Sequence, residues 1–217
     1  MTDTPLKALT AGLRRMFDTG KHTDLVLRCT EDGKEFKVHK AIVCAQSKFF
    51  EKACKPDSFK EGKEHHINLT IGKSSIIAIV LNYLYTLEYD NKNEDILVSH
   101  VNVYEAASFY DIPPLQTLVV EEFKKHLNVE QDSLPKAVRA IYNDIPYLDR
   151  TLRDLALDAI VKNSGTLLGS SEEEATELSK IMDDLPQLGK DLTYRLLLEV
   201  VKVRSDIVAR LTNYPLY

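Results

Sequence analysis

Alternating apolar and polar positions predict a β-hairpin early in the chain. Two short runs have the period of two that is typical of half-buried strands. The apolar positions are Leu25, Leu27 and Cys29 in the first run, and Phe36 and Val38 in the second. Asp32-Gly33 lies between the runs, and an Asp-Gly pair at such a position is a strong turn signal. We therefore expect two antiparallel strands joined at this pair.

The segments before and after this hairpin have apolar residues at helical spacing. A first helix is expected from about Pro5 to Gly20, with a single apolar stripe. The stripe consists of Leu6, Leu9, Leu13, Met16 and Phe17. Two short helices, 39–46 and 47–54, follow the hairpin, and Ser47 is a suitable N-cap for the second. The stripe must be buried, either against the same domain or against a second copy of it.

A third strand and three longer helices complete residues 1–126. Residues 64–71 place Ile67, Leu69 and Ile71 on one side of a strand. A helix with Ser74 as its cap then runs to Tyr85 and is apolar almost all round, which predicts a central, buried helix. Two helices follow at about 96–110 and 114–126.

Residues 127–217 have only helical patterns. Helices are expected to start at Ser133 and Asp149, at a capping box formed by Ser171 and Glu174, and near Asp191. The last helix carries four apolar residues with the spacing of one face, namely Leu196, Val200, Val203 and Ile207. We expect two regions, 1–126 with a small sheet and 127–217 wholly helical.

Composition and charge narrow the classes of function. The 217 residues are 44% hydrophobic, enough for a real core, and 28 basic against 33 acidic residues give a net charge of −5. This balance argues against nucleic-acid binding and against attachment to anionic membranes. No segment has the apolar run of a signal peptide or a membrane span, and the three cysteines lack the spacing of a disulfide framework. We expect reduced thiols and a cytoplasmic or nuclear location.

The residues and motifs that could carry catalytic chemistry do not form a recognisable active site. The adjacent His65 and His66 face opposite sides of a strand, which argues against joint metal binding. Gly72-Lys73-Ser74 resembles the end of a phosphate-binding loop, but Ile67 stands where its first glycine is required. No nucleophile motif is found. We therefore expect no catalytic residues, no cofactor, no metal and no enzymatic activity.

Taken in order, several motifs resemble the BTB/POZ domain family over about residues 5–126. They are Asp24-Leu25-Val26-Leu27, Phe36-Lys37-Val38-His39-Lys40-Ala41-Ile42-Val43, Ser47-Lys48-Phe49-Phe50 and Leu81-Asn82-Tyr83-Leu84-Tyr85-Thr86. The resemblance implies an α+β fold, a small three-stranded sheet with a cluster of helices. Residues 127–217 resemble the BACK-type helices that follow many BTB domains, an all-α extension.

The resemblance also implies a protein–protein interaction module, most concretely a substrate adaptor of a cullin–RING ubiquitin ligase. In such adaptors an apolar residue, any residue and a glutamate precede the third strand, as Phe59-Lys60-Glu61 do here. Phe59 would fill a pocket and Glu61 would cap a helix of the cullin, with Lys48, Lys52 and Tyr110 forming the surrounding surface. The alternative is that Phe59 packs beneath its own loop while Glu61 is simply solvated.

Two further predictions concern structure and assembly. Asp24, His39 and Lys40 are expected to form a structural polar cluster, since buried polar groups must be paired. The stripe of the first helix is expected to be a homodimer interface, with packing on its own domain as the alternative. Because little sequence precedes Pro5, we expect no exchanged N-terminal strand, and we expect no separate substrate-reading domain before Tyr217. The other candidate function is a self-associating scaffold or regulatory partner, including in transcription, with no ligase role.

Overall fold

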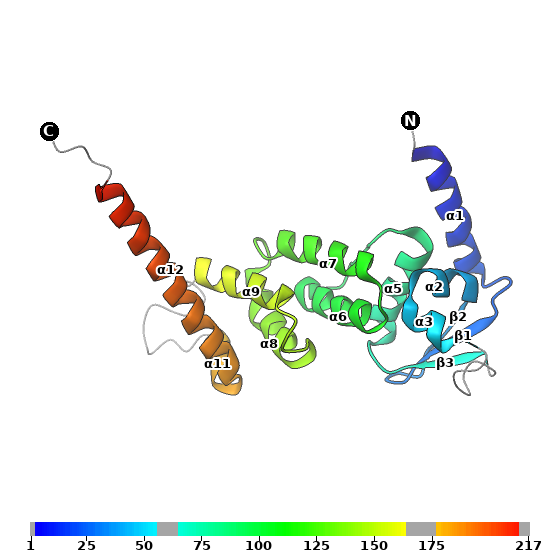
Figure 1. Cartoon of the computed structure of the whole chain (residues 1–217). Helices are drawn as coiled ribbons and strands as arrows, with labels where there is room; N and C mark the ends of the chain where they lie inside the picture. Colours follow the sequence, from blue (N-terminus) through cyan, green and yellow to red (C-terminus); the bar gives the residue numbers. More distant parts are fainter. Residues whose placement is uncertain (1–2, 56–64, 164–176, 213–217) are drawn as a thin grey trace. The chain divides into compact units, whose positions relative to one another are not determined.

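The computed structural model describes residues 3–55, 65–163 and 177–212 (Figure 1). The chain divides into two compact units, residues 1–126 and 127–217. The first unit contains three strands and six helices among its described residues, and those of the second are helical. The two units are described in turn.

The sheet of the first unit has the order β2-β1-β3. Strand β1 (Leu25–Cys29) pairs antiparallel with β2 (Glu35–Val38) and parallel with β3 (His66–Leu69). The predicted hairpin is confirmed, with Leu27 opposite Phe36 and with Gly33 in the turn at a φ of 71°. The apolar side chains of β1 alternate inward and are essentially inaccessible, as the period of two requires.

Six helices accompany this sheet in the described part of the first unit, in the order that the hydrophobic pattern predicts. They are α1 (Asp3–Thr19), α2 (Lys40–Gln46), α3 (Lys48–Ala53), α5 (Ser74–Thr86), α6 (Ile96–Phe109) and α7 (Pro113–His126). Helix α5 packs against α1, α2 and α6, and α6 packs against α7. The prediction of a central buried helix is confirmed, because eight side chains of α5 are buried.

The predicted cap of α5 is wrong. Ser74 is the first helical residue, and the N-cap position is held by Lys73, whose side chain makes no capping bond. The backbone N–H of Ser74 instead donates to the carboxylate of Asp32 at 3.2 Å. The hairpin turn therefore caps the central helix across 42 residues of sequence. The pKa of Asp32 is lowered, chiefly by a hydrogen bond with the Ser74 side chain and then by the backbone N–H groups of Lys34 and Ser74.

The described part of the second unit is a set of packed helices. They are a short 3₁₀ helix, η1 (Gln131–Ser133), followed by α8 (Leu134–Asp144), α9 (Thr151–Lys162), α11 (Glu177–Asp184) and α12 (Pro186–Thr212). Helix α12 starts earlier than predicted, at Pro186, because Leu188 and Leu192 are buried and extend the helix back to a proline suited to the first turn. The predicted capping box of Ser171 and Glu174 lies outside the described residues.

A buried arginine that the sequence did not mark holds the turn between α8 and α9. Arg153 is only 1% exposed, and its guanidinium donates to the carbonyls of Tyr147, at 2.7 Å, and Ile145, at 3.4 Å. The same group lies over the rings of Tyr142 and Tyr147, with its central carbon 4.6 and 5.2 Å from their centres. Two carbonyls and two aromatic faces thus compensate the burial of this cation.

Several general features bear on function. Cys29, Cys44 and Cys54 are all free thiols. Within the part of the chain that the structure describes, none of the helices has the length and apolar character needed to cross a bilayer. The same residues hold no group of three or more histidine, cysteine, aspartate or glutamate side chains that could bind a metal ion.

Candidate protein-binding site

Helix α3 presents one side to the core and the other to solvent. Its N-cap is Ser47, as predicted, and the Ser47 hydroxyl accepts from the backbone N–H of Phe50 at 3.1 Å. Phe50 is 1% exposed and anchors the helix, while Phe49 is half-buried at its edge. Lys48 and Lys52 are exposed. The helix therefore combines a fixed apolar side with a charged outer side.

Four aromatic rings join α3 to the end of α6. The ring centre of Phe49 lies 5.5 Å from that of Phe109 and 5.1 Å from that of Tyr110. Phe50 stacks on Tyr110 at 5.5 Å with an angle of 10° between the planes. Phe109 is 46% exposed, so the cluster reaches the surface at Phe109 and, in part, at Phe49. We call this surface, formed by α3 together with Phe109, the aromatic face.

The end of α6 sets the position of Phe109. Asp111 follows the helix at a φ of 53°, and its N–H donates to the carbonyl of Ser108 at 3.1 Å. The N–H of Ile112 donates to the carbonyl of Ala107 at 2.8 Å, and the Ile112 side chain is buried. These two bonds with a left-handed residue form a Schellman motif, which ends the helix at a defined place. Phe109 and Tyr110 are consequently held against α3.

Tyr110, predicted as a contact residue, is fully buried. Its hydroxyl donates to the carbonyl of Ile71 at 2.6 Å, and its own carbonyl accepts from the Ser47 hydroxyl at 2.6 Å. Burial raises the pKa of the phenol, so the group is neutral. Tyr110 therefore supports the aromatic face from beneath, and the neighbouring Phe109 is the exposed ring at this end of α6.

Phe59 and Glu61 lie outside the described residues. Their segment connects α3 to β3 in the sequence. Among the described residues that precede it, 48–55, the exposed charges are three lysines, Lys48, Lys52 and Lys55, and one acid, Glu51. The ion pair between Lys55 and Glu51 spans 3.7 Å between exposed groups. A surface of this kind, with aromatic rings beside lysines, suits an acidic amphipathic segment of a partner.

The predicted polar cluster joins β1, α2 and α5. The Asp24 carboxylate accepts from the backbone N–H of Lys40 at 2.7 Å and so caps α2. The imidazole of His39 lies 2.8 Å from both the Tyr85 hydroxyl and the carbonyl of Lys21. Since a carbonyl can only accept, Nε2 carries the proton and Nδ1 accepts from Tyr85. Asp24, which is exposed, and His39, which is buried, thus bind separate partners, and both contacts hold elements of the fold together.

A second buried network, between α6 and α7, was not found from the sequence. His100 is 1% exposed, and its Nδ1 lies 2.5 Å from the hydroxyl of Tyr89 while its Nε2 lies 3.2 Å from Nδ1 of His126. Burial and the neighbouring His126 lower the pKa of His100 to about 4. His126 also donates to the carbonyl of Glu122 at 2.9 Å. His100 is therefore a neutral residue of the core above pH 5 or so.

The apolar stripe of α1 is divided between two environments. At its C-terminal end, Phe17 stacks on Tyr85 with 4.6 Å between ring centres, and Arg14 donates to Asn82 at 2.5 Å. Leu13 and Met16 are half-buried. At its N-terminal end, Leu6 and Leu9 are 51% and 59% exposed. One half of the stripe thus packs on its own unit, and the other half is available to a partner.

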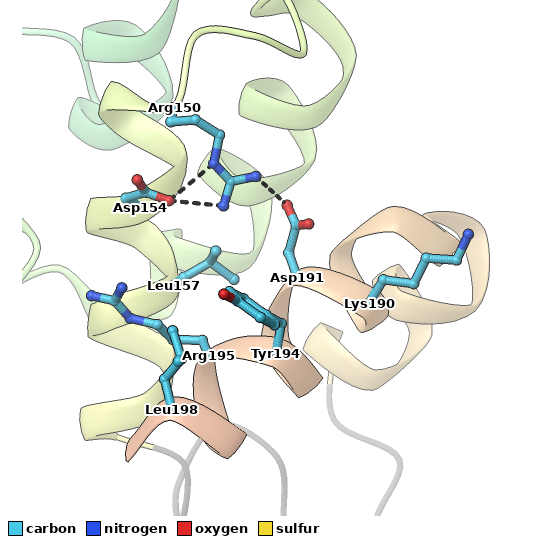
Figure 2. Close-up of a pocket in the computed structure, with 8 residues that line it drawn as sticks. All are labelled: Arg150, Asp154, Leu157, Lys190, Asp191, Tyr194, Arg195 and Leu198. Carbon is cyan, nitrogen blue, oxygen red and sulfur yellow. Dashed lines mark hydrogen bonds and ion pairs between the residues drawn. The ribbon is translucent and has the colours of Figure 1, made fainter. Parts of the chain in front are cut away.

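The second unit contains a polar pocket between α9 and α12 (Figure 2). The Arg150 guanidinium at its rim bridges the carboxylates of Asp154 and Asp191, each at 2.8 Å. Burial acts to raise the pKa of Asp191, but hydrogen bonds from Gln187, Arg150 and Tyr142 outweigh it, and the pKa is lowered. These charges are satisfied by one another, so the arrangement locks α12 to α9 and provides no group poised for acid–base catalysis.

Comparison with known proteins gives a family match and two similar sequences. The sequence profile of the BTB/POZ domain matches residues 13–127. A BTB/POZ domain-containing protein of Arabidopsis thaliana, At1g01640, is 29% identical over 166 residues, which cover 75% of each chain. The Inhibitor of Bruton tyrosine kinase of Xenopus laevis is 26% identical over 165 residues, 76% of this chain but 11% of that protein.

Solved structures are similar as well, and one of them serves as an example. The BTB domain of zebrafish PATZ1 matches 58% of this chain and 96% of its own with a TM-score of 0.46 and 19% identity. The family match spans more than half of the chain, and the order of strands and helices described above lies within it. The chain therefore belongs to the BTB/POZ domain family, whose members are protein–protein interaction modules.

Proposed function

We propose that this protein is an adaptor that links a cullin scaffold to a target protein, with the aromatic face as the cullin-binding surface. The observation that supports it best is Phe109, 46% exposed and packed against the half-buried Phe49 at the edge of α3. A large ring held rigidly at the surface is the usual anchor of an interface, because little side-chain entropy is lost on binding.

The proposed complex has a specific division of roles. Phe109 and Phe49 provide apolar contact area, and Lys48 and Lys52 attract an acidic helix of the cullin. Phe59 and Glu61 are assigned the anchor and helix-capping roles by resemblance to cullin adaptors. The activity is assembly of a complex, without a chemical step on this chain.

The experiment is a calorimetric titration of the full chain with the N-terminal domain of a BTB-binding cullin. We expect Phe109→Ala, Phe59→Ala and Glu61→Ala each to weaken binding by about tenfold or more, equivalent to about 1.4 kcal/mol. The double variant Lys48→Glu/Lys52→Glu is expected mainly to slow association and to reduce its dependence on salt.

Two matched controls separate the aromatic face from general effects. Lys37 is exposed on β2, so Lys37→Glu reverses one such charge away from α3. Leu148 is 90% exposed in the second unit, so Leu148→Ala removes exposed apolar area elsewhere. Both controls should bind as the parent does. Equal affinity of the parent and the aromatic-face variants, or no binding by the parent, would refute the adaptor function.

A second candidate function is a self-associating scaffold without a ligase role. It is favoured by the exposed half of the α1 stripe, Leu6 and Leu9, which is apolar and which the described residues of its own unit leave uncovered. Sedimentation equilibrium of the parent and of Leu6→Glu/Leu9→Glu tests it. A parent that stays monomeric at micromolar concentration excludes this scaffold.

A further inference from the structure

The C-terminal half of α12 exposes an apolar face that no other described element covers. Its first half is buried, with Leu188 at 0% and Leu192 at 3% exposure. Beyond this point the same helix has Val200 at 63%, Val203 at 53% and Ile207 at 52%. Continuous exposed apolar surface of this kind marks an interaction site.

The apolar face lies on the side of α12 that is turned away from α9. Arg195 and Leu198 face α9, where Arg195 forms an ion pair with Asp158. At 3.6 residues per turn, Leu196, Val200, Val203 and Ile207 fall on the opposite side. They share one shallow groove with Glu199 on one edge and Arg204 on the other. We call this surface the α12 seam; it consists of Leu196, Glu199, Val200, Val203, Arg204, Ile207 and Val208.

We propose that the α12 seam pairs with the α12 seam of a second copy as a parallel, in-register, two-stranded coiled coil. The spacing from Leu196 through Val200 and Val203 to Ile207 is four, three and four residues, the repeat of alternating d and a positions. β-Branched residues then occupy both a positions, Val200 and Ile207, and the d positions are Leu196 and Val203. β-Branched residues at a with leucine at d favour a parallel dimer, a pattern that Val200, Ile207 and Leu196 follow and Val203 does not.

The charges beside the seam select the same orientation. In this register Glu199 is at a g position and Arg204 is at the e position five residues later. A parallel pair sets Glu199 of each copy against Arg204 of the other, which gives two attractive contacts related by a twofold axis. An antiparallel pair would bring Glu199 close to Asp206 of the partner copy, an acidic pair. The charge pattern is therefore self-complementary only when the helices run in the same direction.

The helix is already formed where the seam begins, which lowers the cost of pairing. The hydrogen bonds of Asp191 with Arg150 and Tyr142, and the ion pair of Arg195, fix its first half on the second unit. A seam of two heptads is short, so we expect a dimer that dissociates on dilution into the micromolar range or so.

The test is sedimentation equilibrium of the full chain with two neighbouring valines changed in turn. Val203 is in the seam, and Val201, 61% exposed, lies outside it on the neighbouring side of the helix. Val203→Glu should raise the dissociation constant by about tenfold or more, because it places a charge in the buried seam, whereas Val201→Glu should leave the constant unchanged. Both comparisons are repeated with Leu6→Glu/Leu9→Glu, which removes association through α1.

Charge exchange tests the orientation. Glu199→Lys and Arg204→Glu should each weaken the dimer, and the double variant Glu199→Lys/Arg204→Glu should restore it. Three results would overturn the proposal: a parent that remains monomeric in the Leu6→Glu/Leu9→Glu background, equal effects of Val203→Glu and Val201→Glu, or no restoration by the double variant. The second of these would point to a wider surface that binds another protein or another part of this chain.

Discussion

Tyr85→Phe removes a single oxygen atom from the network that joins α5 to α2. The Tyr85 hydroxyl accepts from the backbone N–H of His39 at 2.9 Å and donates to Nδ1 of the same residue at 2.8 Å. Both Tyr85 and His39 are buried, at 0% and 6% exposure. The phenylalanine ring retains the stacking on Phe17, so the variant changes hydrogen bonding and leaves packing nearly intact.

The expected loss of stability follows from the two groups left without a partner. A buried donor or acceptor that loses its hydrogen bond costs about 1–3 kcal/mol. Water cannot replace the hydroxyl without opening the packing between α1 and α5, so we expect a total of about 2–3 kcal/mol. In a chain of this length the melting temperature should fall by about 4–10 °C.

The assay is urea unfolding followed by circular dichroism, with the slope of the transition compared between variants. Tyr83→Phe is the matched control: Tyr83 lies on the same helix and is buried at 6% exposure, and the structure shows no hydrogen bond of its hydroxyl within the described residues. It should change stability by less than about 0.5 kcal/mol. Equal effects of the two substitutions would refute the reasoning, since they would assign the loss to the ring environment instead of the bond with His39.

Three other predictions use the same unfolding assay. The pKa of His100 is about 4 in the folded chain and 6.5 in the reference state, so the unfolded state binds the proton more tightly. The free energy of unfolding should therefore fall by up to about 3 kcal/mol as the pH falls from 6.5 towards 4. His100→Gln should make this part of the stability profile less dependent on pH than it is in the parent. Leu87 ends α5 at a φ of 61° and is 48% exposed, so Leu87→Gly should stabilise the chain by about 1 kcal/mol, and a loss of stability would show that the side chain packs usefully. Asp24→Ala removes the cap of Lys40 and should cost about 1 kcal/mol, whereas Asp24→Asn should recover most of it.

Local signals predicted most of the fold. Asp32-Gly33 identified the hairpin, and Ser47 identified the start of α3, because each acts on residues within a few positions of itself. The start of α12 was placed too late, because Leu188 and Leu192 take part in the core in a way that a pattern read from Asp191 onwards does not include.

The features that the sequence analysis assigned wrongly or did not find depend on contacts between residues far apart in the chain. Asp32 caps α5 from the hairpin turn, and no rule of local spacing relates it to Ser74. Tyr110 was assigned to the contact surface by resemblance to cullin adaptors, but its side chain is buried and its hydroxyl is bonded to Ile71, which is 39 residues away. Burial of Arg153 likewise depends on the two tyrosine rings that cover it. Such groups can be identified only once the fold has brought their partners together.

The two exposed apolar surfaces, on α1 and on α12, have a common construction. Each helix is fixed at one end, by Phe17 on Tyr85 in α1 and by Asp191 with Arg150 in α12, and each exposes leucine or valine at the other. If both surfaces self-associate as proposed, two outcomes are possible: the surfaces close a single dimer if they share a twofold axis, and they build larger assemblies if they do not. The parent, Leu6→Glu/Leu9→Glu and Val203→Glu distinguish these outcomes by mass. If the parent has a mass larger than that of a dimer and both variants have the mass of a dimer, the two surfaces have separate twofold axes. If the parent is a dimer and each variant only weakens that dimer, the two surfaces share one twofold axis.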